Sequence, residues 1–368
     1  MPTSSDHSTN MNRPNKIWVL GAGQLGAMLH SAGLPLALEV EPIDIKSEQL
    51  LDIGDIDIVT AEREKWPATT ATKQLEAHPN FVNKDIFSRL ADRLTQKQVL
   101  DDLGIATTPW CALEQSTDIH ILHEKLGSKV LLKRRTGGYD GRGQHWIDQN
   151  KAKTIPEDWR DQAIAEKKIP FEDEVSVIGV RNKKGEMVFY PLVLNLHLDG
   201  ILMGSLSPVS RNQHLQSQGE QMLGRLMEGL NYVGVMAMEC FRVGDQLMVN
   251  EVAPRVHNSG HWTLAGANIS QFEYHLRAIT DLPIPAAVVK APTAMINLIG
   301  TPYSEKWLEI PGAEPYWYSK EVRPGRKVGH INFCNSNISE LDDSLHQLQT
   351  LLPDNYSVAI DWICKNLA

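Results

Sequence analysis

A twelve-residue stretch from Lys133 to Gln144, K-R-R-T-G-G-Y-D-G-R-G-Q, has the composition of a phosphate-binding loop. Its four glycines let backbone N–H groups turn toward an anion, because no Cβ blocks the approach. Lysine and arginine supply the positive charge that neutralises a phosphate. The apolar run Val130–Leu132 precedes the stretch and is typical of a buried strand. A mobile surface turn is the alternative, but such a turn needs neither the glycines nor the flanking cations.

Two acidic residues lie in apolar segments that we predict to be the strands of one hairpin. Glu239 belongs to Val233–Val243 and Glu251 to Gln246–Val252, with a Gly-Asp turn between the segments. A buried carboxylate needs a partner, and Mg²⁺ prefers carboxylate and amide oxygens, so Glu239, Glu251 and Asn250 are candidate metal ligands. A two-residue turn would place Asn250 opposite Glu239, whereas a longer loop or a β-bulge would bring Glu251 to the same face. Salt-bridged residues at a sheet edge are the alternative.

The segment P-R-V-H-N-S-G-H-W-T, which begins at Pro254, follows these acids directly. Arg255 and His257 alternate in it and can share one face of an extended chain. An arginine can bind a carboxylate or a bicarbonate-like anion through two N–H groups, and a histidine can orient or protonate that anion. A buried structural histidine is the alternative for His257.

A second cationic cluster lies near the C-terminus and turns on Pro324-Gly325. Four cations in eight residues suit a further phosphate site, or else a solvated basic loop. The four are Lys320, Arg323, Arg326 and Lys327.

The N-terminal Gly21-x-Gly23-x-x-Gly26 matches a dinucleotide-binding fingerprint, with Glu41 near the position of a ribose-binding acid. Strand, glycine turn and helix also occur where no dinucleotide binds. We therefore favour a structural turn or a minor substrate contact over a nicotinamide site.

Alternating strand and helix patterns in the first hundred residues predict a mostly parallel, doubly wound sheet. The expected strands there are 16–20, 36–45, 56–60 and 81–83, and one or two helices are expected at 85–103. Residues 130–133 and 145–147 should pair around the glycine-rich loop. Later segments predict strands at 162–169, 175–181 and 188–195, helices at 213–230 and 269–279, and a proline-rich linker at 282–292.

The composition is that of an ordinary soluble globular protein, and the length suggests two or three domains or one large enzyme of several subdomains. The chain has 368 residues, 42% of them hydrophobic and 22% charged, and a net charge of −9. This charge disfavours general binding to nucleic acid or to an anionic membrane. Four widely spaced cysteines suit reduced thiols in the cytoplasm. We interpret the polar residues 1–15 as a disordered leader, and no apolar run is long enough to span a bilayer.

These motifs together resemble the ATP-grasp superfamily. The runs A-D-R-L-T-Q-K, G-V-M-A-M-E-C-F, P-R-V-H-N-S-G-H-W-T and K-E-V-R-P-G-R-K-V-G-H resemble, more narrowly, the 5-(carboxyamino)imidazole ribonucleotide synthases of purine biosynthesis. The resemblance runs from residue 16 to the C-terminus. It implies an α/β and α+β architecture with an ATP-grasp fold. An N-terminal Rossmann-like domain would span 16–104, a two-lobed ATP-grasp domain 105–290 with a lid at about 105–168, and a small α+β domain 291–368.

The family's reaction joins ATP, bicarbonate and 5-aminoimidazole ribonucleotide to give ADP, phosphate and the carboxyamino product. By motif, the resemblance implies that ATP is bound by Arg93, Lys133, Gly138, Tyr139, Asp140, Gly141, Arg142, Gly143, Gln144, Glu166, Lys167, Lys168, Ile169, Glu174, His197, Asn250 and Glu251. It implies Mg²⁺ ligation by Glu239, Glu251 and Asn250. It places the ribonucleotide and bicarbonate near Tyr139, Asp140, Arg255, His257, Lys320 and Arg326. The implied catalytic residues are Lys133, Asp140, Arg255 and His257.

The sequence departs from the family pattern in two places. Ala27 stands where an arginine often follows the glycine turn, and the adenine-reading segment A-E-K-K-I-P-F is rich in lysine. Backbone recognition of adenine survives if the lysines point outward. A different ATP-grasp ligase with a phosphorylated acceptor, or a non-catalytic nucleotide-binding protein, are the alternative functions. The family also implies a cytoplasmic homodimer.

Overall fold

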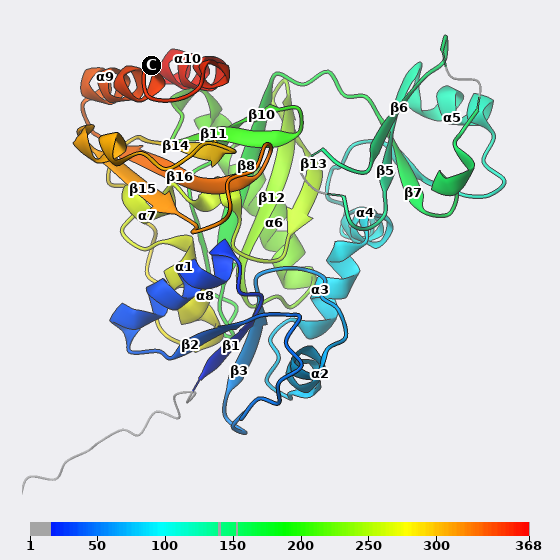
Figure 1. Cartoon of the computed structure of the whole chain (residues 1–368). Helices are drawn as coiled ribbons and strands as arrows, with labels where there is room; N and C mark the ends of the chain where they lie inside the picture. Colours follow the sequence, from blue (N-terminus) through cyan, green and yellow to red (C-terminus); the bar gives the residue numbers. More distant parts are fainter. Residues whose placement is uncertain (1–15, 139–140, 152–153, 368) are drawn as a thin grey trace, which may run out of the picture.

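The structure, a computed structural model, describes residues 16–138, 141–151 and 154–367, and these residues form three β-sheets (Figure 1). The predicted leader 1–15 and the candidate site residues Tyr139 and Asp140 lie outside the described residues. In Figure 1 the N-terminal sheet is at the bottom, a four-stranded sheet stands out to the right, and the largest sheet lies between them and the C-terminal helices.

The N-terminal sheet is parallel and doubly wound, as predicted. Its strands are β1 (Ile17–Leu20), β2 (Val40–Ile43) and β3 (Ile58–Ala61), in the order β2-β1-β3. One face packs against α1 and α8, and the other against α2 and α3, which gives each face its own apolar core. These helices are α1 (Gln24–Gly33), α2 (Thr70–Ala77), α3 (Lys84–Ala91) and α8 (Gln271–Ile279).

The prediction of a fourth strand at 81–83 is wrong. Phe81 makes an isolated parallel bridge with Val59, and Asn83 then takes a left-handed conformation with φ of 61°. That conformation ends the extended chain before α3 begins. Asp92 separates α3 from α4 (Arg93–Asp102) and caps α4 by accepting from the N–H of Leu94 at 2.9 Å. The region 85–103 therefore forms two helices.

The four-stranded sheet is antiparallel, with the order β4-β7-β5-β6. Its strands are β4 (Trp110–Leu113), β5 (Lys129–Arg134), β6 (Gln144–Asp148) and β7 (Ala163–Lys167), and α5 (Ile119–Leu126) covers one face. The pairing of β5 with β6 confirms the predicted strands on either side of the glycine-rich loop.

The largest sheet is antiparallel and runs β13-β12-β8-β10-β11-β14-β16-β15, with β9 paired to β8. Its first part contains β8 (Asp173–Arg181), β9 (Met187–Phe189), β10 (Val193–Leu198), β11 (Ile201–Ser207), β12 (Gly234–Val243) and β13 (Gln246–Ala253). The single strand expected at 188–195 is two strands, because Pro191 lies between β9 and β10 and has no N–H to donate. The helix expected at 213–230 is α6 (Gln216–Gly229), preceded by a 3₁₀ turn.

The C-terminal strands continue this sheet rather than forming a separate one. β14 (Thr293–Ile299) pairs with β11, and β15 (Ala313–Trp317) and β16 (Lys327–Cys334) follow. Helices α9 (Ile338–Gln349) and α10 (Ser357–Asn366) pack beside them in the core, and α7 (Thr263–Gly266) is a short helix after β13. The sheet thus crosses the predicted boundary at 290–291, which stays a prediction. All four cysteines are free.

Glu62 fills the glycine turn that matched the dinucleotide fingerprint. Its carboxylate accepts from the N–H of Gly23 at 2.7 Å and from the N–H of Gly26 at 2.5 Å. A Cβ on Gly21, whose φ is +121°, would lie 2.3 Å from the Glu62 side chain. The glycines therefore admit a carboxylate of the chain itself, which caps α1 where a dinucleotide phosphate would otherwise sit.

Three buried charges join the four-stranded sheet to α4. Lys97 of α4 and Lys133 of β5 are 2% and 6% exposed, and Glu166 of β7 is 3% exposed. Glu166 Oε1 lies 2.9 Å from Lys97 Nζ, and Glu166 Oε2 lies 2.6 Å from Lys133 Nζ. Burial alone would raise the pKa of the Glu166 carboxyl, but the two ammonium groups outweigh it and hold that pKa at about 2.

We expect Glu62→Ala to lower the free energy of unfolding by about 1–3 kcal/mol, because two N–H groups at the start of α1 lose a charged acceptor. Urea unfolding at neutral pH measures the change. The control is Glu41→Ala, which alters an exposed carboxylate of β2 in the same sheet and should change little. A Glu62→Ala variant as stable as the unaltered protein would contradict this capping role.

The low pKa of Glu166 predicts a loss of stability in acid. Its folded pKa lies below the unfolded value, so its contribution is complete above about pH 5 and disappears as the pH falls toward about 2, on the order of 3 kcal/mol in all. Urea unfolding at several pH values should give a shallower acid dependence for Glu166→Gln than for the unaltered protein. Glu124→Gln, an exposed change on α5, should keep the full dependence. Equal slopes for Glu166→Gln and the unaltered protein would rule out this contribution.

Candidate active site

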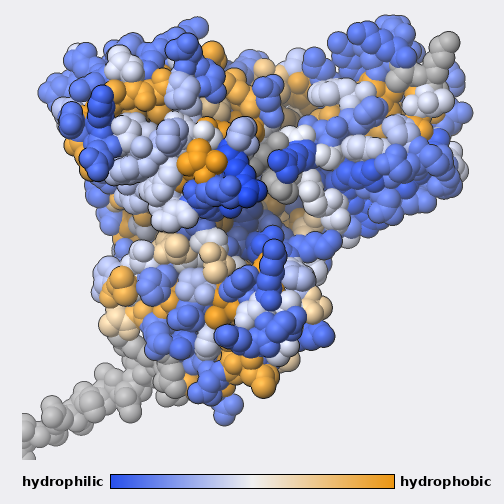
Figure 2. Space-filling view, in the orientation of Figure 1, coloured by the Kyte–Doolittle hydropathy of each residue, from blue (hydrophilic) through white to orange (hydrophobic). Residues whose placement is uncertain are grey.

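A cavity of about 520 Å³ lies where the three sheets meet. Figure 2 shows a hollow between the four-stranded sheet and the rest of the molecule, surrounded largely by hydrophilic side chains. Most of the side chains predicted to do chemistry line this cavity. They are Arg93, Lys133, Gly141, Arg142, Gln144, Glu174, His197, Glu239, Asn250, Glu251, Arg255 and His257.

A β-bulge brings both candidate acids to the cavity. Glu239 of β12 pairs with Glu251 of β13, and the next pair is Cys240 with Val249, so Asn250 is the extra residue. The bulge settles the register that the sequence left open. It also lets two consecutive residues, Asn250 and Glu251, line the same cavity as Glu239.

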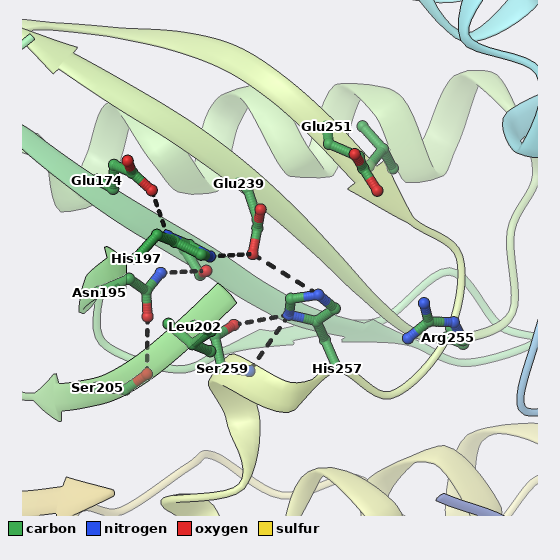
Figure 3. Close-up of polar contacts among 12 residues, drawn as sticks. Glu174, Asn195, His197, Leu202, Ser205, Glu239, Glu251, Arg255, His257 and Ser259 are labelled. Atoms are coloured by element: carbon green, nitrogen blue, oxygen red, sulfur yellow. Dashed lines mark hydrogen bonds and ion pairs between the residues drawn. The ribbon is translucent and has the colours of Figure 1, made fainter. Parts of the chain in front are cut away.

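Two histidines flank the carboxylate of Glu239 (Figure 3). Its Oε1 lies 3.9 Å from Nε2 of His197 and 3.7 Å from Nε2 of His257. His197 also pairs with Glu174 through Nδ1. The Nδ1 atom of His257 lies 2.9 Å from the hydroxyl of Ser259. The two imidazoles, which come from β10 and from the segment after β13, therefore converge on one acid.

The charges around Glu239 set different protonation states for these groups. Burial, together with Glu251 and Glu174, raises the pKa of Glu239 against the opposing effect of His197. Burial lowers the pKa of His197, but the hydrogen bond to Glu174 and the charge of Glu239 outweigh it and raise that pKa overall. Burial, reinforced by Arg255 and Lys327, lowers the pKa of His257 well below its ordinary value. His257 is therefore a neutral imidazole at neutral pH.

Two cations from the four-stranded sheet and α4 face these acids across the cavity. Arg93 lies 3.2 Å from Glu251 and donates to the backbone oxygens of Arg134 and Gly138, both at 2.9 Å. Lys133 donates to Asn250 Oδ1 at 2.8 Å in addition to its pairing with Glu166. Arg93 therefore anchors the glycine-rich loop through its hydrogen bonds to Arg134 and Gly138.

The described glycines of the loop lie near the same opening. Gly138 lines a second cavity of about 440 Å³, which shares Arg63, Arg93, Glu251 and Arg255 with the first. Gly141 and Gly143 have positive φ, of 74° and 68°, which explains the need for glycine there.

The structure shows how the side chains of segment 166–169, which the resemblance assigns to adenine, are placed. The side chains of Lys167 and Lys168 are exposed, and Ile169 is half-buried. Glu166 instead points inward to Lys97 and Lys133. Sequence reasoning also missed Phe171 and Phe241, which line the cavity and stack with ring centroids 4.5 Å apart. No pattern in the sequence marked these two aromatic residues as neighbours.

The C-terminal cations do not all lie at the cavity. Lys320 donates to the side chain of Gln24, at the glycine turn, and Lys327 lines the cavity. Arg326 is exposed and does not line it. Arg255 pairs with Glu64 at 2.8 Å. The missed residues Glu62 and Arg63 follow β3, and the rule that ligands gather at the carboxyl ends of parallel strands could have found them.

Comparison with known proteins identifies the family. An ATP-grasp domain matches residues 98–272, and a phosphoribosylaminoimidazole carboxylase C-terminal domain matches residues 293–344. N5-carboxyaminoimidazole ribonucleotide synthase from Haemophilus influenzae is 51% identical over 95% of this chain and 97% of its own length. The Escherichia coli enzyme of that name is 49% identical over 94% of this chain and 98% of its own length.

Solved structures agree with these sequence relatives. N5-carboxyaminoimidazole ribonucleotide synthetase from Thermus thermophilus superposes with a TM-score of 0.80 at 38% identity, over 91% of this chain and 98% of that one. The synthase from Aspergillus clavatus, in complex with ADP and 5-aminoimidazole ribonucleotide, gives 0.80 at 28% identity, over 92% and 98%. The chain therefore belongs to the N5-carboxyaminoimidazole ribonucleotide synthase family of ATP-grasp enzymes.

Proposed function

We propose that this protein uses ATP to carboxylate 5-aminoimidazole ribonucleotide with bicarbonate, giving 5-(carboxyamino)imidazole ribonucleotide, ADP and phosphate in purine biosynthesis. The observation that carries the proposal is one cavity, in a member of this family, that contains Lys133, the Glu239–Glu251 pair and His257. Phosphoryl transfer needs charge and positioning more than covalent chemistry, and these residues supply both.

The nucleotide fits between the four-stranded sheet and the acids. Arg93, Lys133 and the glycine-rich loop would contact its phosphates. The backbone of residues 166–169 would contact adenine, and the side chain of Glu174 would contact the ribose. The candidate residues Tyr139 and Asp140 lie outside the described residues, so their roles rest on the sequence motif.

The oxygen donors of Glu239, Glu251 and Asn250 fit a magnesium ion. They face one cavity, and repulsion from Glu251 and Glu174 contributes to the raised pKa of Glu239, a cost that a cation would relieve. When bound, the cation would neutralise negative charge on the transferring phosphoryl group.

The resemblance to the family also supports a homodimer in the cytoplasm. Among the described residues, no helix has both the length and the apolar character needed to cross a membrane.

Bicarbonate would bind near Arg255 and His257. One of its oxygens attacks the γ-phosphoryl group of ATP, forming carboxyphosphate as the bond to ADP breaks. The neutral imidazole of His257 can donate one hydrogen bond to the anion, while the positive charge comes from Arg255. The exocyclic amine of the ribonucleotide then takes up the carboxyl group, either from carboxyphosphate or from carbon dioxide that it releases. Phosphate leaves, and Asp140 is the candidate base for the amine proton.

The phosphate of the ribonucleotide would bind at the C-terminal cations. Lys320 reaches the glycine turn at Gln24, and Lys327 lines the cavity. Arg326, which the motif also implicates, would have to turn toward the cavity when the substrate binds.

An ADP-release assay that omits each substrate in turn tests the proposed reaction. We expect rapid release only when ATP, magnesium, bicarbonate and 5-aminoimidazole ribonucleotide are all present. Release at the full rate without the ribonucleotide, or with a different phosphorylated acceptor in its place, would point to another ATP-grasp ligase. No release under any combination would favour a non-catalytic nucleotide-binding protein.

Lys133→Ala and His257→Ala should each reduce turnover about a hundredfold to a thousandfold, because each removes one group aimed at the reacting phosphoryl or bicarbonate. Circular dichroism should show that both variants remain folded. The matched controls are Lys129→Ala, an exposed lysine on β5, and His120→Ala, an exposed histidine on α5. A variant that turns over near the normal rate would remove that residue from the mechanism.

A further inference from the structure

Lys97 is a buried cation that neither the motifs nor the proposed reaction uses. It lies on α4, one helical turn after Arg93, and does not line the cavity. Its Nζ atom lies 2.9 Å from Glu166 Oε1, 2.6 Å from Thr107 Oγ1 and 2.8 Å from Thr108 Oγ1. A longer contact of 3.5 Å joins Nζ to the backbone oxygen of Val249, so there are acceptors enough for all three N–H groups of the ammonium.

The surroundings of Lys97 hold it in place. The hydroxyl of Thr107 donates to the backbone oxygen of Val249 at 2.7 Å, which leaves its lone pairs to accept from Lys97. Val249 precedes the bulge residue Asn250 on β13. Lys97 therefore reaches from α4 to Glu166 on β7 and to the start of the bulge on β13, and its side chain does not line the cavity.

The positive charge of Lys97 offsets the negative charge that Glu166 places beside Lys133. The buried group of Lys97, Lys133 and Glu166 carries two positive charges and one negative charge. Of the three, only Lys133 lines the cavity, so the uncompensated positive charge is presented there. Without Lys97, the carboxylate would cancel Lys133, and an incoming phosphate would compete with Glu166 for the same ammonium group.

We propose that Lys97 is a positioning residue for the nucleotide: it holds the carboxylate of Glu166 and so leaves the charge of Lys133 free to bind phosphate. The inference rests on the proposed function only in requiring that a nucleotide phosphate occupies this cavity. Glu166 would keep one buried partner when Lys133 turns to the phosphate, and would not be left as an unpaired buried charge.

Two full-length variants separate this charge role from a purely structural one. Lys97→Met removes the charge but keeps an unbranched apolar side chain. The double variant Lys97→Met with Glu166→Gln removes a positive and a negative charge together, so the buried group keeps the net single positive charge of the unaltered protein. The control is Lys84→Met, an exposed lysine on α3.

Calorimetric titration with ADP and magnesium gives the readout. Lys97→Met should weaken ADP binding about tenfold to a hundredfold, the usual effect of one hydrogen bond to a charged group. The double variant should return to within about threefold of the unaltered protein. In the complete reaction, Lys97→Met should raise the KM for ATP more than that for the ribonucleotide.

Three results would overturn the proposal. They are normal ADP binding by Lys97→Met, a folded double variant that binds as weakly as Lys97→Met, and equal rises in both KM values. If Lys97→Met does not fold, the double variant still decides the matter, because a loss of more than tenfold in ADP affinity contradicts the charge role. Failure of the substrate-omission assay would leave this binding result intact, so the two ideas fail separately.

Discussion

The arrangement of the cavity depends on one buried carboxylate held between two ammonium groups. Glu166 lies on β7, Lys133 on the neighbouring strand β5, and Lys97 on a helix outside that sheet. A buried charge must be paired, and these pairs can form only if the four-stranded sheet lies against α4 in one orientation. The same contact places Arg93, at the start of α4, beside the glycine-rich loop and Glu251. The position of Gly138 near Glu251 therefore depends on the ion pairs that Glu166 forms with Lys97 and Lys133.

The second constraint is the bulge in the hairpin of β12 and β13. In a regular strand, consecutive side chains point to opposite faces, and either Asn250 or Glu251 would point away from the cavity. One extra residue removes this restriction and gathers two acids and an amide in a small space. Burial raises the pKa of Glu239, and repulsion from Glu251 and Glu174 adds to this effect. Such a concentration of negative charge is unfavourable for the empty protein and suits a site that binds a cation.

Local patterns made part of this architecture predictable. The hairpin, the two helices before residue 103 and the strands around the glycine-rich loop all followed from apolar periodicity and turn residues. The contacts that the sequence did not predict join residues that are distant in the chain. Glu62 fills a glycine turn 36 to 39 residues away, and Lys97 meets Glu166 from another element. No spacing rule links such residues. The glycine turn therefore matched a dinucleotide fingerprint, and Lys97 gave no sign in the sequence that it contacts Glu166.

The pairings in the cavity also bear on the form of nucleotide it accepts. Arg93 is paired with Glu251 and Lys133 with Asn250, so candidate phosphate contacts are bonded to candidate metal ligands. A nucleotide alone would draw the cations away and leave the acids without partners. A metal ion alone would take the acids and leave Arg93 without its carboxylate. A metal–nucleotide complex would replace both sets of partners together, with its phosphates at the cations and its metal at the acids. The ion pair of Arg93 with Glu251 and the hydrogen bond of Lys133 to Asn250 therefore favour a ligand that carries both charges over either one alone.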